Sequence, residues 1–249
     1  MILYFTGTGN SFFAAQRLAE ALDDTLYSIN DAMRRGKRDH LSSHQPYVVT
    51  CPIYTGRIPR VVSDWLQAAT FSGSRDLYFV VTCSETPWKA TGYCKKLAQR
   101  MRMAFQGLGA VVMPQNYLVN YDIPSPEESE RIVRAAQPKL AMLADRIRVR
   151  QDLPQEPERC FMSGLVNPIF YPLMVHAKKF RSTDACVGCN LCVKACPLNN
   201  VQLDANHHPR WGGRCTHCMG CISICPQQAI QYGDKTASRY RNWNAAYHV

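Results

Sequence analysis

The sequence has no uninterrupted run of apolar residues long enough to cross a membrane. A spanning helix needs about 18 consecutive apolar residues, and the nearest candidate, residues 160–177, is interrupted by Pro168 and Pro172. Met1 leads directly into an apolar strand pattern, without the basic end and cleavage site of a signal peptide. We therefore expect a cytoplasmic chain without a transmembrane segment.

Motifs of nucleic-acid-binding proteins are also missing. The sequence contains no zinc-finger, helix-turn-helix or aromatic-basic RNA-binding pattern. Acidic residues are scarce, with 19 Asp and Glu against 29 Lys and Arg, so the formal net charge is +10. Without a binding motif this charge does not indicate a nucleic-acid partner, and we expect none.

Residues 1–150 alternate between short apolar runs and segments with helical apolar spacing. The candidate strands and helices are residues 2–5, 12–22, 47–51, 61–69, 77–83, 93–106 and 110–113. Buried parallel strands are typically short apolar runs, and the crossovers between them are amphipathic helices. The pattern predicts an α/β domain with a doubly wound parallel sheet.

A further helix is predicted to begin at Ser125 and to end the first domain. Ser125 can cap it, Pro126 suits its first turn, and Glu128 completes a capping box. Pro138 is expected to kink this helix. The predicted domain order is 1–150 for the sheet domain, 151–177 for a linker and apolar strap, 178–232 for a cysteine-rich domain and 233–249 for a tail.

The cysteines are strongly clustered. Of 12 cysteines, eight lie between Cys186 and Cys225. A disulfide-stapled secreted domain is shorter and does not gather its cysteines in repeated triplets, so the pattern indicates metal thiolates in a reducing compartment. The remaining four are expected to be small packing residues, and they are Cys51, Cys83, Cys94 and Cys160.

The cluster consists of one motif that occurs twice. The first cysteine motif (Cys186–Pro197) and the second cysteine motif (Cys215–Pro226) both read C-x2-C-x2-C-x3-C-P. This is the run of bacterial two-cluster ferredoxins, in which the fourth cysteine binds the other cluster. The resemblance implies Cys186, Cys189, Cys192 and Cys225 as ligands of cluster one, and Cys196, Cys215, Cys218 and Cys221 as ligands of cluster two.

Zinc is the alternative occupant of these thiolates. Structural zinc sites favour two Cys or His pairs separated by a longer loop, whereas here each triplet has its own Cys-Pro. Eight thiolates suffice for two [4Fe–4S] clusters. His207, His208 and His217 are therefore expected to be solvent-facing loop residues.

A Gly-rich loop, Thr6–Ser11, follows the first predicted strand and opens the first helix. Its glycines allow a tight turn with backbone N–H groups aimed at an anion, and three hydroxyls add donors. The third glycine of a dinucleotide fingerprint is replaced by Phe12, and no Walker Gly-Lys-Ser/Thr is present. The loop resembles the FMN phosphate site of flavodoxins.

The flavodoxin resemblance implies a five-stranded sheet and two further loops that enclose the flavin ring. Tyr54, Trp88 and Tyr93 are the candidates for stacking on the ring. The expected FMN-binding residues are Thr6, Gly7, Thr8, Gly9, Asn10 and Ser11 at the phosphate, with Pro52, Ile53, Tyr54, Thr55, Gly56, Ser84, Glu85, Thr86, Trp88 and Tyr93 around the ring.

As a whole, the chain resembles flavodoxin–ferredoxin fusion proteins. The resemblance implies FMN and two [4Fe–4S] clusters, a flavodoxin-like domain followed by a small α+β two-cluster ferredoxin domain, and electron transfer between a low-potential donor, the clusters and FMN. An anaerobic host is implied as well. A small acceptor reduced at the flavin and a pure carrier role both remain open. The alternative is an iron–sulfur redox sensor or regulatory protein without turnover.

Charge suggests the direction of electron flow. Arg57 and Arg60 lie in the first ring loop without a neighbouring acid, which favours the anionic reduced flavin and raises its potential. FMN is thus expected to accept electrons from the clusters. Two clusters and the flavin phosphate lower the net charge to roughly +4, which still favours acidic redox partner proteins.

Overall fold

The computed structural model describes residues 1–36, 39–154, 156, 171 and 175–241. Cys160, most of the strap and the aromatic tail residues Trp243 and Tyr247 lie outside the described residues. In the described part of the chain, no helix is both long and apolar enough to span a membrane.

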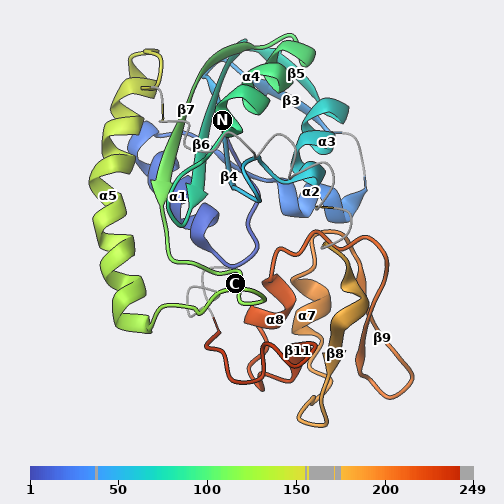
Figure 1. Cartoon of the computed structure of the whole chain (residues 1–249). Helices are drawn as coiled ribbons and strands as arrows, with labels where there is room; N and C mark the ends of the chain where they lie inside the picture. Colours follow the sequence, from blue (N-terminus) through green and yellow to red (C-terminus); the bar gives the residue numbers. More distant parts are fainter. Residues whose placement is uncertain (37–38, 155, 157–170, 172–174, 242–249) are drawn as a thin grey trace.

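A five-stranded parallel sheet forms the centre of the N-terminal domain (Figure 1). The strand order β2-β1-β4-β6-β7 places the first strand between the second and third strands of the sheet, as in a flavodoxin-like doubly wound fold. The predicted fold class is confirmed. The strands are β1 (Ile2–Tyr4), β2 (Leu26–Ser28), β4 (Tyr47–Pro52), β6 (Asp76–Cys83) and β7 (Ala104–Val112).

Helices cover both faces of the sheet. On one face, α1 (Asn10–Leu22) and α5 (Pro126–Arg148) pack on alternate strand residues such as Val48 and Val80. On the other face, the intervening residues such as Val49 and Phe79 meet the remaining helices, because successive strand side chains point to opposite faces. These helices are α2 (Ile29–Arg35), α3 (Arg60–Ala68) and α4 (Ala90–Arg100).

The largest differences from the predicted boundaries lie at α4 and β7. The helix expected over 93–106 is α4, which ends at Arg100, and β7 begins at Ala104 rather than at residue 110. Gly107 has φ +115 and lies beside a register shift between Leu77 and Phe79 of β6, so the irregular start of β7 hides the strand pattern. A small parallel pair, β3 (His40–Ser43) and β5 (Thr70–Gly73), was not predicted.

The helix start at Ser125 is confirmed. The Glu128 N–H donates to Ser125 Oγ at 3.2 Å, whereas the Glu128 carboxylate pairs with Arg131 instead of completing the capping box. The helix continues through Pro138 as one element.

The C-terminal domain is a small α+β unit built from short elements around its own core (Figure 1). The expected hairpin is present, since β9 (Val201–Leu203) pairs with β10 (Pro209–Trp211). A second antiparallel pair, β8 (Phe180–Ser182) with β11 (Ile230–Tyr232), connects the two ends of the domain. The remaining elements are the 3₁₀ turn η1 (Ala177–Lys179) and the short helices α7 (Leu191–Lys194) and α8 (Gly220–Ser223).

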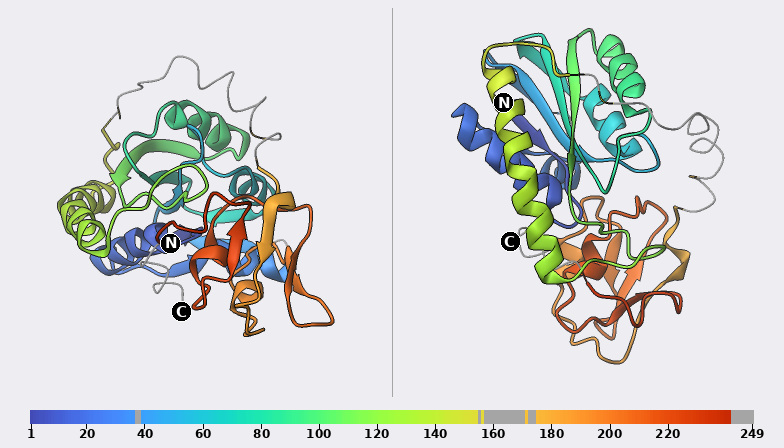
Figure 2. Two further views of the ribbon diagram at one scale, coloured as in Figure 1. Left: turned by 60° about the horizontal axis from the view of Figure 1, so that its bottom comes forward. Right: turned by 60° about the vertical axis from the view of Figure 1, so that its left-hand side comes forward.

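The small domain lies against the carboxyl ends of the sheet strands (Figures 1 and 2). Leu118, Val119 and Ile123, from the connection between β7 and α5, are part of its hydrophobic core. The Asn199 amide donates to the Arg34 carbonyl at 2.9 Å, and Arg239 donates to the Leu118 carbonyl at 2.6 Å. Ligands of doubly wound folds bind at this edge of the sheet, so the small domain covers the position where they are expected.

Candidate functional site

Two cavities in the small domain are each lined by four cysteines. Cavity one is lined by Cys186, Cys189, Cys192 and Cys225. Cavity two is lined by Cys196, Cys215, Cys218 and Cys221. The structure thus brings together the two predicted ligand sets, including the exchange of the fourth cysteine between the motifs.

The two motifs use the same local backbone to present their thiols. In each, a residue with left-handed φ precedes a one-turn helix, namely Asn190 (φ +68) before α7 and Met219 (φ +63) before α8. Backbone N–H groups point at sulfur, from Asn200 to Cys196 Sγ at 3.3 Å and from His217 to Cys215 Sγ at 3.4 Å. Such N–H···S contacts tune the potential of an iron–sulfur cluster.

The thiol chemistry fits metal coordination. Burial raises the pKa of Cys215 to about 11 and that of Cys218 to about 12, so the negative thiolate form needs a nearby positive charge. Iron supplies that charge and deprotonates the coordinating thiol. In a cubane each thiolate binds a different iron, which suits four sulfurs spread around a cavity. Among the described residues, no three Cys, His, Asp or Glu side chains form a single-ion site.

The loop between β1 and α1 has the donors of an anion site. Gly9 adopts φ +106, which glycine tolerates without steric cost. The first turn of the 13-residue helix α1 carries no acidic residue, so its N-terminal partial charge is not neutralised there. Ser11 Oγ lies 2.7 Å from Thr82 Oγ1, and Thr6 Oγ1 accepts from the Gly9 N–H at 3.1 Å. Hydroxyls and a helix N-terminus fit a phosphate.

Two asparagines that the sequence analysis did not single out fix this loop. Asn30 accepts from the Thr6 N–H at 2.9 Å and donates to the Thr6 carbonyl at 2.8 Å. Asn116 Nδ2 donates to Thr8 Oγ1 at 2.6 Å. Asn30 lies just beyond β2 and Asn116 just beyond β7, at the ligand-binding edge of the sheet. A position after a predicted strand could have identified Asn116, but not Asn30, because β2 has no clear strand pattern in the sequence.

The two predicted ring loops meet at the same edge. Tyr54 and Arg57 close a turn through the Tyr54 N–H and the Arg57 carbonyl at 2.8 Å, with Thr55 and Gly56 at positive φ. The Arg57 guanidinium lies over the Tyr93 ring, 5.0 Å from its centroid. Pro52 ends β4, and the Ile53 N–H donates to the Thr82 carbonyl at 2.9 Å.

Arg57 supports a site for an anionic or electron-rich group. Its Nε is buried and has no hydrogen-bond partner among the described residues. Burial, with the charge of Arg60 nearby, lowers the pKa of Arg57. A flavin ring between the two loops would present carbonyl and nitrogen acceptors to such a donor, so the residues here fit FMN.

The structure does not bring the other predicted ring-loop residues together at one place. Trp88 adopts φ +52 before α4, and Ser84 Oγ accepts from the Gln115 amide at 3.4 Å. Glu85 and Thr86 line a separate groove between β7 and α5. Their predicted contact with the ring stays a prediction.

His217 differs from its expected position. It is buried rather than solvent-facing, whereas His207 is exposed and His208 intermediate. His217 Nδ1 accepts from the Tyr117 hydroxyl at 3.0 Å, and its Nε2–H donates to the His176 carbonyl at 2.7 Å. The carbonyl can only accept, which assigns this neutral tautomer. Residues distant in sequence supply both partners, so local spacing did not predict the burial.

The isolated cysteines pack as expected where the structure describes them. Cys51 and Cys94 are fully buried in the core of the sheet domain. Cys83 is partly buried at the end of β6, 4.0 Å from the Val111 carbonyl.

Residues 185–230 match the family described as 4Fe-4S dicluster domain. A ferredoxin from Pyrobaculum islandicum is 39% identical over 49 residues, which is 19% of this chain and 45% of that protein. The iron-sulfur subunit of a formate dehydrogenase from Haemophilus influenzae is 29% identical over 62 residues, 21% of this chain and 19% of that protein. The matches therefore span less than half of these curated relatives.

A solved structure of general stress protein 14 from Treponema denticola, in complex with FMN, covers 59% of this chain and 97% of its own. Its identity is 14% and its TM-score 0.39. The fold of the sheet domain follows from its strand order.

Proposed function

We propose that this chain, which joins a flavodoxin-like domain to a 4Fe-4S dicluster domain, carries FMN and two [4Fe–4S] clusters. In this proposal, single electrons pass between the clusters and the flavin. The observation that carries this proposal is the convergence of four cysteines on each of two cavities, beside the edge of the sheet where the phosphate loop lies. Iron–sulfur clusters transfer single electrons, and a flavin exchanges either one electron or two.

The ligand assignment follows the cavities. In this proposal Cys186, Cys189, Cys192 and Cys225 hold cluster one, and Cys196, Cys215, Cys218 and Cys221 hold cluster two. The small domain positions the thiols, shields them from water and directs backbone N–H groups at Cys196 and Cys215. These features set the cluster potentials.

The flavin-site residues divide by task. Thr6–Ser11 bind the phosphate through hydroxyls, backbone N–H groups and the N-terminus of α1. Residues 52–56 and 84–93 enclose the ring, with Tyr54, Trp88 and Tyr93 offering aromatic faces. Arg57 stabilises negative charge on the reduced ring and so raises its potential. FMN supplies the step between one-electron and two-electron chemistry.

Redox proteins are the proposed partners, in a reducing cytoplasm. The relatives named above are a ferredoxin and the iron-sulfur subunit of a dehydrogenase. The net positive charge favours acidic partner proteins by electrostatic steering. We further propose that the final electron acceptor is a small molecule that is reduced at the flavin.

Cofactor analysis tests this function. The protein is purified and reconstituted without oxygen with iron, sulfide and FMN, and each is quantified after gel filtration. The proposal predicts about eight iron and eight sulfide, as in two [4Fe–4S] clusters, and about one FMN per chain. Zinc at one atom per motif, or a protein that retains clusters but no flavin, would overturn it.

A further inference from the structure

The two cysteine motifs have the same spacing but opposite surroundings. In the first motif, Val187 is 65% exposed and Cys189 is exposed. In the second, the intervening residues Thr216, His217 and Met219 are 3%, 4% and 2% exposed. The Cys215–Cys221 segment is therefore covered, and the Cys186–Cys189 segment is more open to solvent.

The cover of the second motif includes the phosphate loop. A Cβ added at Gly7 would lie 1.9 Å from the Cys218 carbonyl oxygen, far inside van der Waals contact. A Cβ added at Gly220 would lie 2.8 Å from the Gly7 carbonyl oxygen. Each glycine thus permits the backbone of the other loop to approach, and we call this contact the Gly7–Gly220 junction. A side chain at either position would force the two loops apart.

The equivalent position in the first motif shows that the cluster itself does not require this glycine. Gly220 precedes the third cysteine of its motif, and Leu191 holds that position in the first motif. Both residues begin a one-turn helix, α8 and α7 respectively. The glycine is therefore explained by the close approach of the other domain.

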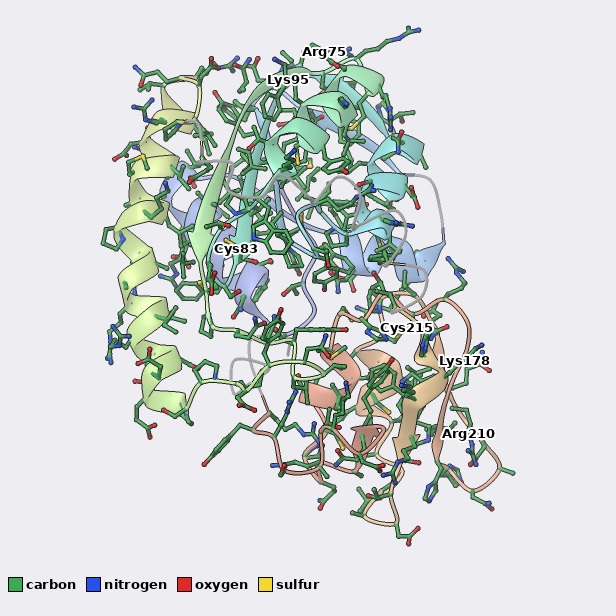
Figure 3. The ribbon with its side chains drawn as sticks, in the orientation of Figure 1. Arg75, Cys83, Lys95, Lys178, Arg210 and Cys215 are labelled. Atoms are coloured by element: carbon green, nitrogen blue, oxygen red, sulfur yellow. The ribbon has the colours of Figure 1, made fainter. Side chains whose placement is uncertain are left out.

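Further contacts hold the second motif against the sheet domain. The Tyr117 hydroxyl, from the connection after β7, donates to His217 at 3.0 Å. The Cys218 side chain itself packs against the hydrophobic core of the sheet domain. Figure 3 shows Cys215 on the side of the small domain that faces the sheet domain.

We propose that the Gly7–Gly220 junction is the internal route for electrons. Cluster two, held by Cys196, Cys215, Cys218 and Cys221, exchanges electrons directly with FMN at the Thr6–Ser11 loop. Cluster one, on the exposed side, exchanges them with an external one-electron carrier protein. This assignment rests on the proposed function and adds the order of the sites.

Each internal transfer is balanced. The cluster is oxidised by one electron and the flavin is reduced by one; two transfers and one proton from solvent give the anionic reduced flavin. The external carrier protein supplies both electrons, one at a time, through cluster one.

The decisive variant is Gly220→Ala, which adds a methyl group at the junction without altering a cysteine or the phosphate loop. Gly213→Ala is the matched control, because a Cβ there meets nothing within 4 Å. Both holoproteins are reduced by a flash-generated methyl viologen radical, and the later first-order bleaching of the flavin is followed. We expect Gly220→Ala to slow that phase several-fold, with iron and FMN contents and cluster EPR signals as in Gly213→Ala. Unchanged bleaching would overturn the route.

A second measurement tests the proposal even if Gly220→Ala does not assemble with its cofactors. Reduced clusters are paramagnetic and broaden the ³¹P resonance of nearby FMN phosphate. The proposal predicts that this broadening survives loss of cluster one in Cys189→Ala and is largely lost with cluster two in Cys215→Ala. If the broadening is instead lost in Cys189→Ala and survives in Cys215→Ala, the assignment of the two clusters is wrong, while the proposed function stands. If the fully loaded wild-type protein shows no intramolecular flavin reduction at all, the proposed function fails instead.

Discussion

Val187 and Thr216 hold the same position in the two cysteine motifs, yet Val187 is largely exposed and Thr216 is buried. Gly188 and Leu191 are partly exposed, whereas their counterparts His217 and Gly220 are buried. The cysteine spacing, which is identical, defines the kind of cluster that each motif binds. The residues between the cysteines define the surroundings of that cluster: the Cys186–Cys189 segment is more open to solvent, and the Cys215–Cys221 segment packs against the sheet domain.

Loss of a cluster should have the largest effect, and it tests whether the two motifs contribute unequally to the stability of the protein. Cys189→Ala and Cys218→Ala should each reduce iron from about eight to about four per chain. Because cluster two supports the domain junction, Cys218→Ala should also lower the melting temperature markedly more than Cys189→Ala. Iron analysis and anaerobic thermal unfolding measure both effects. Equal destabilisation would remove the structural contrast between the motifs.

Removal of the His217 side chain tests the buried side directly. His217→Ala should lower the free energy of unfolding by about 2–4 kcal/mol, from the cavity and the two lost hydrogen bonds. His207→Ala, at an exposed histidine, should stay within about 0.5 kcal/mol. Chemical denaturation of the holoproteins, followed by cluster absorbance, gives the comparison.

Tyr117→Phe separates the hydrogen bond from packing. It removes the donor to His217 Nδ1 and should cost about 1–2 kcal/mol. If Tyr117→Phe has no effect while His217→Ala is severe, packing rather than the hydrogen bond holds the second motif in place.

Thr8→Val tests whether the loop beside the second motif binds phosphate. The substitution keeps the shape but removes the buried hydroxyl, and should weaken FMN binding about tenfold. Riboflavin, which lacks the phosphate, is the matched ligand and should bind both proteins equally. Flavin fluorescence quenching measures both affinities. An equal loss for the two flavins would place the phosphate elsewhere.

The last prediction concerns Arg57 in the first ring loop and Arg60 at the start of α3. Replacement of Arg57 and Arg60 by Gln should lower the flavin potential by about 20–60 mV, because positive charge near the reduced ring is removed. Arg100→Gln, at the exposed end of α4, is the control. Spectroelectrochemical titration gives the potentials, and an unchanged value would exclude Arg57 and Arg60 as the source of the flavin potential.

The parts of the fold that the sequence predicted are those with strong local patterns. The strands β4 and β6 are buried along most of their length and rich in apolar residues, and Ser125 and Pro126 mark a helix start. The edge strand β2 was missed because it has three residues and Leu26 is exposed. The irregular start of β7, around Gly107, carries no clear alternation.

In the candidate site, too, some features could be predicted from local sequence patterns and others could not. The cysteine sets could be predicted because each motif is contiguous, and the cavities gather those sets. The burial of His217 could not, because its partner Tyr117 lies 100 residues away. The role of Gly7 against Cys218 depends on how two domains pack, which no local spacing encodes.

An anaerobic redox titration of the fully loaded protein, followed by visible and EPR spectra together, tests the central claim most directly. The account predicts that FMN is reduced at a clearly higher potential than both clusters, so that electrons pass from cluster one through cluster two to the flavin. Reduction of FMN at or below the cluster potentials would contradict it and make the flavin the donor or a relay.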